Sequence, residues 1–370
     1  MELFPDRNMV TQIFAAAKAI VGEDPHLLHQ MALYEINRAD GNHAEAARLL
    51  KRAADLAPWD PTIKHSVAEL KLRSAETVKT ELEKNKLLRD AAEIAAGLIT
   101  SEKTDSYPFH TLAKARLRIL QEALVKGSPD IEIEKLAKEV EQTLFDALQR
   151  FPGDPYLLET ESQLATTLED DKRAINALEK AFAANNRSSF IALRLAASYK
   201  KKNEFGKAQS TLEKALAATT NEPRLHYAYA KLLTLIKADS PETLQYHFQR
   251  SFRDGDSNYD AQVLYGRQLF LMKDYDGSRK VFAKLSEAHL GPAQRNKLLY
   301  PIEGQLFQGQ VSKREAGYCF IARDGAGDWI YAHASNMDEN TWQKLTLGKR
   351  VEFKIAFSIR GVKAFEVHLL

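Results

Sequence analysis

The feature that most constrains the fold of this chain is a set of small and apolar residues that recurs at a fixed step. The set occupies positions 174, 178 and 181 and returns at positions 208, 212 and 215, a step of 34 residues. Its spacing of four and then three residues puts all three side chains on one face of a helix. A step of this length holds a pair of helices, and such a pair buries its apolar face by stacking on the next pair. The recurring residues are Ala174, Leu178 and Ala181 in one copy and Ala208, Leu212 and Ala215 in the next.

The same pattern extends over most of the chain. Alanine and leucine recur at helical spacing from about residue 9 to residue 290. A step of 34 with small residues where two helices cross resembles the tetratricopeptide repeat, although the tryptophan usual in that family is missing. We therefore expect a mainly α chain, in which about seven or eight divergent helix pairs form a solenoid. An earlier copy of the repeated set is Ala46, Leu50 and Ala53.

The last part of the chain has the pattern of short β-strands. Side chains alternate between the two faces of a strand, so residues 318–321 and 329–334 each separate into two sets. One face carries rings, which together make a platform on which nucleic-acid bases can stack. The other face carries small apolar residues and is the predicted core. The ring face has Tyr318, Phe320, Trp329, Tyr331 and His333, and the core face has Cys319, Ile321, Ile330, Ala332 and Ala334.

Residues 304–370 resemble the cold-shock domain, a small OB-type barrel. The two characteristic strand motifs of that family are similar to residues 316–321 and 330–335, and Asp324-Gly325 supplies the turn between them. The tail is also similar, at residues 348–353 and 360–364. This resemblance implies that base stacking falls to Tyr318, Phe320, Tyr331 and His333, and Trp329 has the right strand parity to extend their surface.

The sequence departs from the cold-shock pattern at several positions. Ala316 replaces the lysine that opens the first motif, and Ala334 replaces the last aromatic residue of the second. Ser312-Lys313-Arg314 stands where the family has a Trp-Phe pair, so we expect Lys313 and Arg314 to be basic contacts beside the platform. Two uses of the ring face stay open: stacking on single-stranded nucleic acid, RNA or DNA, or docking of the barrel against the helical part.

Composition excludes several other classes of function. The 52 Lys and Arg residues nearly balance the 50 Asp and Glu residues, so no global charge attracts the chain to nucleic acid or to a membrane. A single cysteine, Cys319, excludes an internal disulfide framework and a multi-cysteine metal cluster. No basic start followed by an apolar run marks a signal peptide, so we expect a cytoplasmic protein. We find no catalytic motif and no metal-ligand spacing, and we expect a non-enzymatic protein without a small-molecule cofactor.

These patterns predict three segments: a tetratricopeptide-like solenoid over 1–290, a linker over 291–303 and the barrel over 304–370. Such solenoids mostly bind proteins or peptides, so we expect a protein or peptide partner in the groove. We expect no interaction with a membrane. The linker is short, which predicts that the barrel rests on the last repeats. Groove positions inferred from the repeat are Met31, Glu35, His65, Glu69, Glu159, Gln163 and Gln262.

The order of the two modules resembles the C-terminal sensing half of STAND-type signalling NTPases, which include sterile-alpha-motif proteins of innate immunity and bacterial antiphage relatives. Residues 24–28, Asp-Pro-His-Leu-Leu, share in this likeness. The resemblance implies a role in defence or signalling as a fragment or an adaptor. The sequence leaves open a second function, that of a protein-interaction scaffold in which the barrel is only structural. It does not predict an oligomeric state.

Overall fold

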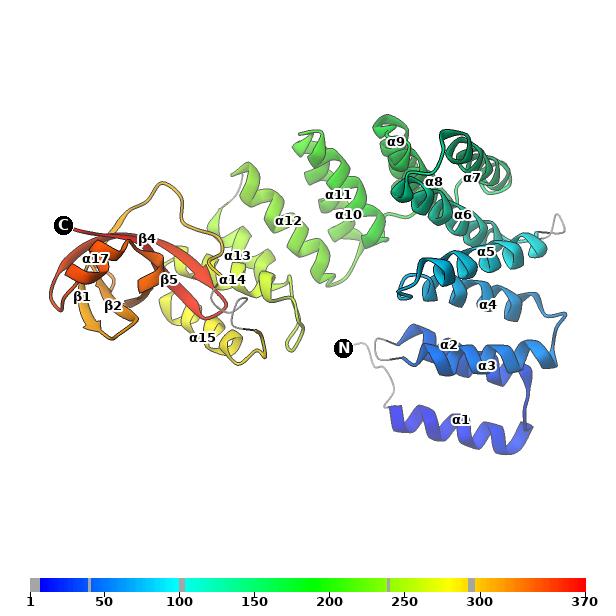
Figure 1. Ribbon diagram of the computed structural model, residues 1–370, viewed down its shortest axis with the longest axis horizontal. Coiled ribbons are helices and arrows are strands. Elements are labelled where there is room, and N and C mark those ends of the chain that lie inside the picture. The colour runs from blue at the N-terminus through cyan, green and yellow to red at the C-terminus, as the bar shows by residue number, and fades with distance from the viewer. Residues whose placement is uncertain (1–6, 39–40, 100–103, 238–239, 292–296) are drawn as a thin grey trace. The chain divides into compact units, whose positions relative to one another are not determined.

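The computed structural model describes residues 7–38, 41–99, 104–237, 240–291 and 297–370. The chain divides into two compact units, residues 1–186 and 187–370, and Figure 1 shows the order of their helices and strands. The first unit is helical, and the second unit combines helices with a β-barrel. The predicted fold class, a mainly α chain with a solenoid followed by a small all-β barrel, is confirmed.

The first unit has one leading helix and four helix pairs. Several first helices of a pair begin with Asp-Pro, because the aspartate side chain accepts hydrogen bonds from the first-turn amides and proline fits the first helical position. The alanines predicted at the helix crossings, such as Ala46 and Ala53, are fully buried. The helices are α1 Arg7–Val21, α2 Pro25–Asn37, α3 His43–Leu56, α4 Pro61–Ser74, α5 Glu81–Leu98, α6 Ser106–Lys126, α7 Asp130–Arg150, α8 Pro155–Thr167 and α9 Asp171–Ala184.

The second unit begins with three more helix pairs. Ala208, Leu212 and Ala215 are buried on the helix that packs against α10 and α12, as the repeat predicts. With the four pairs above, the described residues hold seven pairs, within the expected number. The helices are α10 Ser189–Lys201, α11 Phe205–Ala218, α12 Pro223–Ile236, α13 Pro241–Gln249, α14 Tyr259–Leu271 and α15 Tyr275–Ser286.

The C-terminal strands close into a barrel in the order β1-β2-β3-β5-β4. All neighbours are antiparallel except β3 and β5, which run parallel. Gly309 allows β1 to approach β2, since a Cβ there would lie 2.4 Å from the carbonyl oxygen of Ala322. The elements are β1 Phe307–Arg314, β2 Tyr318–Arg323, β3 Trp329–His333, a 3-10 turn Ala334–Asn336, α17 Glu339–Lys344, β4 Arg350–Ser358 and β5 Gly361–Leu369.

The core face predicted for β2 and β3 is correct for four of its five residues. Cys319, Ile321, Ile330 and Ala332 are at most 2% exposed. Ala334 is only half-buried, because β3 ends at His333 and the chain turns into a 3-10 helix. Strand alternation therefore stops one residue before the predicted core face does.

The barrel packs against the last helix pair of its unit. Phe357 of β4 is fully buried and its ring lies 5.5 Å from the ring of Phe270 in α14 and 6.0 Å from that of Phe282 in α15, centre to centre. Before the barrel, Leu299 pairs with Phe357 through both backbone hydrogen bonds. The barrel thus rests on the last repeats, as the short linker predicted. Of that predicted linker, residues 292–296 lie outside the described residues.

Candidate nucleic-acid interface

Two adjacent strands bring the five predicted rings together on the outside of the barrel. Antiparallel pairing sets Tyr318 opposite His333, and Phe320 opposite Tyr331, and it places Trp329 at the end of the row. Directly opposed residues point to the same face of a sheet, so all five rings share one surface. Trp329 is 63% exposed, His333 is exposed, and the other three are half-buried.

The rings contact one another along this platform. Tyr318 and Tyr331 are nearly parallel, with an interplanar angle of 23° and centres 5.3 Å apart. Phe320 meets Tyr331 edge to face at 5.7 Å and lies 6.4 Å from Trp329. These contacts hold the rings in place, which lowers the conformational cost of stacking a base on them.

A lysine that sequence reasoning did not single out lies against the platform. Parallel pairing places Lys363 of β5 beside Tyr331 of β3, and its ammonium nitrogen lies 3.8 Å from the centre of the Tyr331 ring. Lys363 is only 8% exposed. Burial, with a smaller repulsion from Arg360, lowers the pKa of Lys363 to about 8. An anion beside this ammonium group would relieve the cost of keeping it charged.

Lys363 lines a small hollow of about 90 Å³. The other residues with polar groups in this hollow are Tyr331, His333, Ser335 and Asn336, and no acidic side chain lines it. The Nδ1 atom of His333 lies 2.8 Å from the hydroxyl of Ser335. Within the described residues Lys363 forms no ion pair, so this hollow offers hydrogen-bond donors and a positive charge to an anion such as a phosphate.

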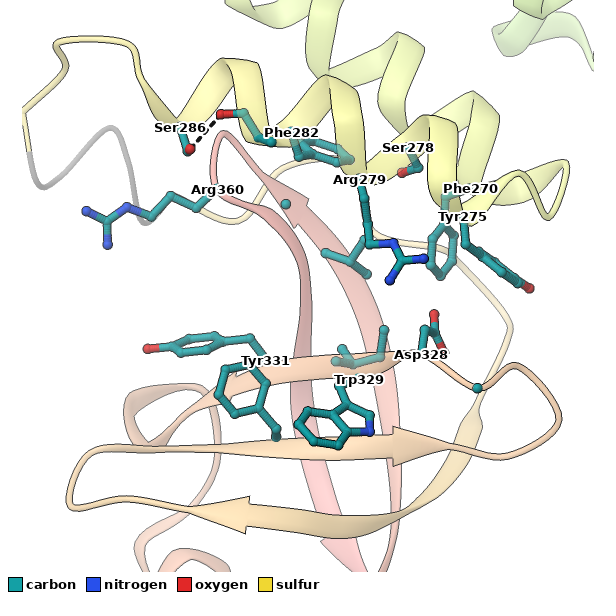
Figure 2. A pocket seen from close by; sticks show the side chains of 16 residues that line it. Phe270, Tyr275, Ser278, Arg279, Phe282, Ser286, Asp328, Trp329, Tyr331 and Arg360 are labelled. Atoms are coloured by element: carbon teal, nitrogen blue, oxygen red, sulfur yellow. Dashed lines mark hydrogen bonds between the residues drawn. The ribbon is translucent and has the colours of Figure 1, made fainter.

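A larger cleft lies at the other end of the platform, between the barrel and α15. Its volume is about 570 Å³, and its barrel side is lined by Phe320, Trp329 and Tyr331. Figure 2 shows Arg279 reaching from α15 into the space above Trp329. Arg360, in the turn between β4 and β5, also lines this cleft.

The two basic residues predicted from the first strand lie differently. Lys313 pairs opposite Phe320, so it is on the ring face, where its ammonium group is 3.1 Å from the carboxylate of Glu315. Arg314 pairs opposite Cys319 and its guanidinium lies 4.5 Å from the centre of the Trp342 ring. The structure therefore brings Lys313 to the platform but places Arg314 over Trp342, because successive residues of a strand point to opposite faces.

None of the seven groove residues predicted in the solenoid is exposed. Glu35 accepts a hydrogen bond of 2.8 Å from the backbone amide of Asn42, and Met31 packs on the core of α2 and α3. Glu159 is 2% exposed and accepts the side-chain amide of Gln163 at 2.7 Å. These side chains are committed to contacts within the chain.

The remaining groove residues are also held by neighbours. The Nε2 atom of His65 lies 2.9 Å from the hydroxyl of Thr111, which donates to Glu69. Gln262 donates to the backbone carbonyl of Asp256 at 3.3 Å. A position counted along the repeat does not tell which side chains are already hydrogen-bonded within the chain.

Two tyrosines that sequence reasoning missed are exposed in the first unit, on helices α6 and α8, each the first helix of its pair. Tyr107 in α6 is 61% exposed and its ring centre lies 6.1 Å from that of His65 in α4. Tyr156 in α8 is 52% exposed and lies 5.8 Å from the ring of His110. Both follow an aspartate cap within two residues, a local signal that could have located them.

Two family models match parts of the chain. Residues 307–370 match the "Cold-shock" DNA-binding domain, and residues 169–232 match the tetratricopeptide repeat. The chain contains tetratricopeptide repeats and a C-terminal cold-shock domain. Modules of the first kind typically bind proteins, those of the second kind typically bind single-stranded nucleic acid, and neither is typically catalytic.

Several solved structures are similar to this chain at low identity. A tetratricopeptide protein of Thermus thermophilus is 19% identical, with a TM-score of 0.46 over 57% of this chain and 99% of that one. Pseudomonas aeruginosa pilF is 17% identical, with a TM-score of 0.42 over 61% of this chain and 91% of that one. The human IFIT1 dimer with m7Gppp-AAAA is 14% identical, with a TM-score of 0.47 over 74% of this chain and 67% of that one. With TM-scores below 0.5, these likenesses say nothing about what this chain binds.

No match is found among curated proteins. Across the described ranges, no helix has the length and apolar character needed to span a membrane. In the same residues, no three or more His, Cys, Asp or Glu side chains are grouped so that they could hold a metal ion.

Proposed function

We propose that this protein is a non-enzymatic adaptor that binds single-stranded nucleic acid, RNA in preference, on the cold-shock barrel and a protein through its repeats. The observation that carries the proposal is the row of five rings outside the barrel core. Rings on an outer sheet face contribute nothing to the core, and stacking is the interaction that they offer to any base. The buried cation of Lys363, which has no ion pair in the described part of the chain, supports the same conclusion, because a phosphate would be its natural counterion.

The alternative is a protein-interaction scaffold in which the barrel only completes the end of the solenoid. Docking of Phe357 on α14 and α15 favours this function, since it accounts for why the barrel is fused there. However, this docking uses the β4–β5 side of the barrel, and the ring face is left facing a cleft. The adaptor function accounts for both features.

Fluorescence anisotropy of the full chain with labelled 12-nucleotide oligo(A) RNA tests the proposal, with oligo(dA) DNA of equal length alongside. The full chain is needed because the barrel core continues into α14 and α15. Changing Tyr318→Ala together with Trp329→Ala should weaken binding at least about 30-fold, from about 1–3 kcal/mol per stacked ring.

Phe145→Ala is the matched control, since Phe145 is an exposed ring (59%) on α7, far from the barrel in sequence. Circular dichroism melting checks that each variant is folded. Equal binding by the double variant and the wild type would rule out stacking, and equal affinity for the two oligonucleotides would rule out a preference for RNA.

For the protein partner we propose a binding surface on helices α6 and α8, each the first helix of its pair, with Tyr107 and Tyr156 as anchors. Tyrosine is enriched among the residues that dominate protein–protein binding, and each of these two rings lies beside a histidine ring. Reversing the charges of Glu35 and Glu69 would be a poor test, because both carboxylates accept hydrogen bonds within the chain. Capture of a protein by the wild type and by Phe145→Ala, but not by Tyr107→Ala with Tyr156→Ala, is the expected result.

We also propose the cytoplasm as the site of action, because a chain with a single cysteine has no internal disulfide, as is usual in a reducing compartment. The order of the modules favours a role in defence or signalling of the STAND type. A phage-challenge assay of cells with and without the gene tests this role, and equal survival would count against it.

A further inference from the structure

We propose that helix α15 of the last repeat forms the second wall of the nucleic-acid site. In this inference, which rests on the proposed function, one nucleotide of the bound strand lies in the cleft between the ring platform and α15. The solenoid is then part of the binding site, and a strand bound at the barrel contacts the last repeat directly.

The first argument is the continuity of the cleft with the platform. Phe320, Trp329 and Tyr331 belong to the row of rings and also line the cleft, so a strand stacked along the row leads into it. The cleft volume of about 570 Å³ lies in the range of about 300–1,000 Å³ that is usual for a pocket holding one small ligand. Trp329, which is 63% exposed, stands at its floor (Figure 2).

The second argument is the charge of the two walls. Asp328 lines the cleft, but both its oxygens are bound by the guanidinium of Arg323 at 2.9 and 2.8 Å, so that charge is compensated. Arg360 has no ion pair among the described residues. Arg279 pairs with Asp276 one turn earlier on α15, and both side chains are more than 70% exposed. An exposed ion pair of this kind is weak, so the guanidinium of Arg279 can leave Asp276 and bind a phosphate.

The third argument is the rigidity of the α15 wall. Phe282 is buried between α14, α15 and the barrel, and a Cβ on Gly266 of α14 would lie 2.8 Å from its ring. The same ring stacks on Phe357 of β4 at an interplanar angle of 17°. This packing fixes the distance between α15 and the barrel, so the cleft exists before the ligand arrives.

Binding of labelled oligo(A) RNA to full-length variants of α15 tests the inference. Arg279→Ala should weaken binding five- to tenfold and make the log–log salt dependence shallower by about 0.7, the value for one phosphate contact on a single strand. Asp276→Asn should strengthen binding, because it frees Arg279. Lys280→Ala is the matched control: it removes a neighbouring exposed charge on the same helix, outside the cleft, and should change neither quantity.

A steric variant tests the same wall without changing charge. Ala283 is exposed and lines the cleft from α15, so Ala283→Trp should fill the cleft and weaken binding at least tenfold, whereas Ala283→Ser should bind like the wild type. If the wild type binds and loss of Trp329 abolishes binding, but every α15 variant matches Lys280→Ala, the inference is wrong and the proposed function stands. If the wild type does not bind, the proposed function itself fails.

Discussion

Raising the pH should weaken nucleic-acid binding because one buried lysine loses its charge. The pKa of Lys363 is lowered to about 8 by burial, with a smaller effect of Arg360. A phosphate in the adjoining hollow would stabilise the ammonium form and bring this pKa back toward its ordinary value of about 10.5. Protonated Lys363 is therefore favoured in the complex, and the affinity is lost as the pH rises through 8 and beyond.

The size of the effect follows from these two pKa values. In the free protein the protonated fraction falls from about three quarters at pH 7.5 to about 3% at pH 9.5, whereas in the complex it stays near 90% or above. Linkage then gives an affinity that is about 20-fold lower at pH 9.5 than at pH 7.5 if the phosphate restores the pKa fully. The stability of the free protein should change in the opposite direction. Because the unfolded chain binds the proton more tightly, stability rises between about pH 8 and 10.5.

Fluorescence anisotropy with oligo(dA) measures this dependence, since adenine does not titrate in the window and DNA resists alkali. Among the neighbours of Lys363, Arg360 stays charged and burial raises the pKa of Tyr331, so neither produces the fall. Lys363→Met should bind weakly at pH 7.5 and show a flat profile, and Lys349→Met, which changes an exposed lysine of the barrel, should keep the wild-type profile. A flat wild-type profile, or the same fall in Lys363→Met, would refute the reasoning.

Three further outcomes are expected. Trp329→Ala should lower nucleic-acid affinity by about 1–3 kcal/mol in anisotropy titrations, more than any half-buried ring of the platform, and an unchanged affinity would contradict stacking at that end. Phe357→Ala should lower the free energy of unfolding in urea by about 3–5 kcal/mol, because the ring is fully buried against Phe270 and Phe282; a loss below about 1 kcal/mol would mean that docking is not stabilising. Burial lowers the pKa of His110 to about 4, so stability should fall as the pH drops from 6.5 to 4, and His110→Phe should remove that part of the dependence in urea titrations at several pH values.

The residues that follow a local rule were predictable from the sequence. Alanines such as Ala208 and Ala215 recur with the repeat and are buried in the solenoid, because helical spacing alone fixes the face to which they point. Strand alternation likewise separated Cys319 and Ile321 from the rings of Tyr318 and Phe320. The rule failed at Ala334, where the strand ends and a 3-10 turn begins.

Contacts between distant segments were decided only by the tertiary structure. Lys363 meets Tyr331 because β3 and β5 run parallel, and nothing in either strand specifies that pairing. The same holds for Arg279, which faces the platform only because Phe357 docks the barrel on α14 and α15. The sequence by itself determined which rings share a face, since alternation is a property of one strand. Long-range packing decides which cations and which helix lie beside those rings, so no local sequence pattern predicts them.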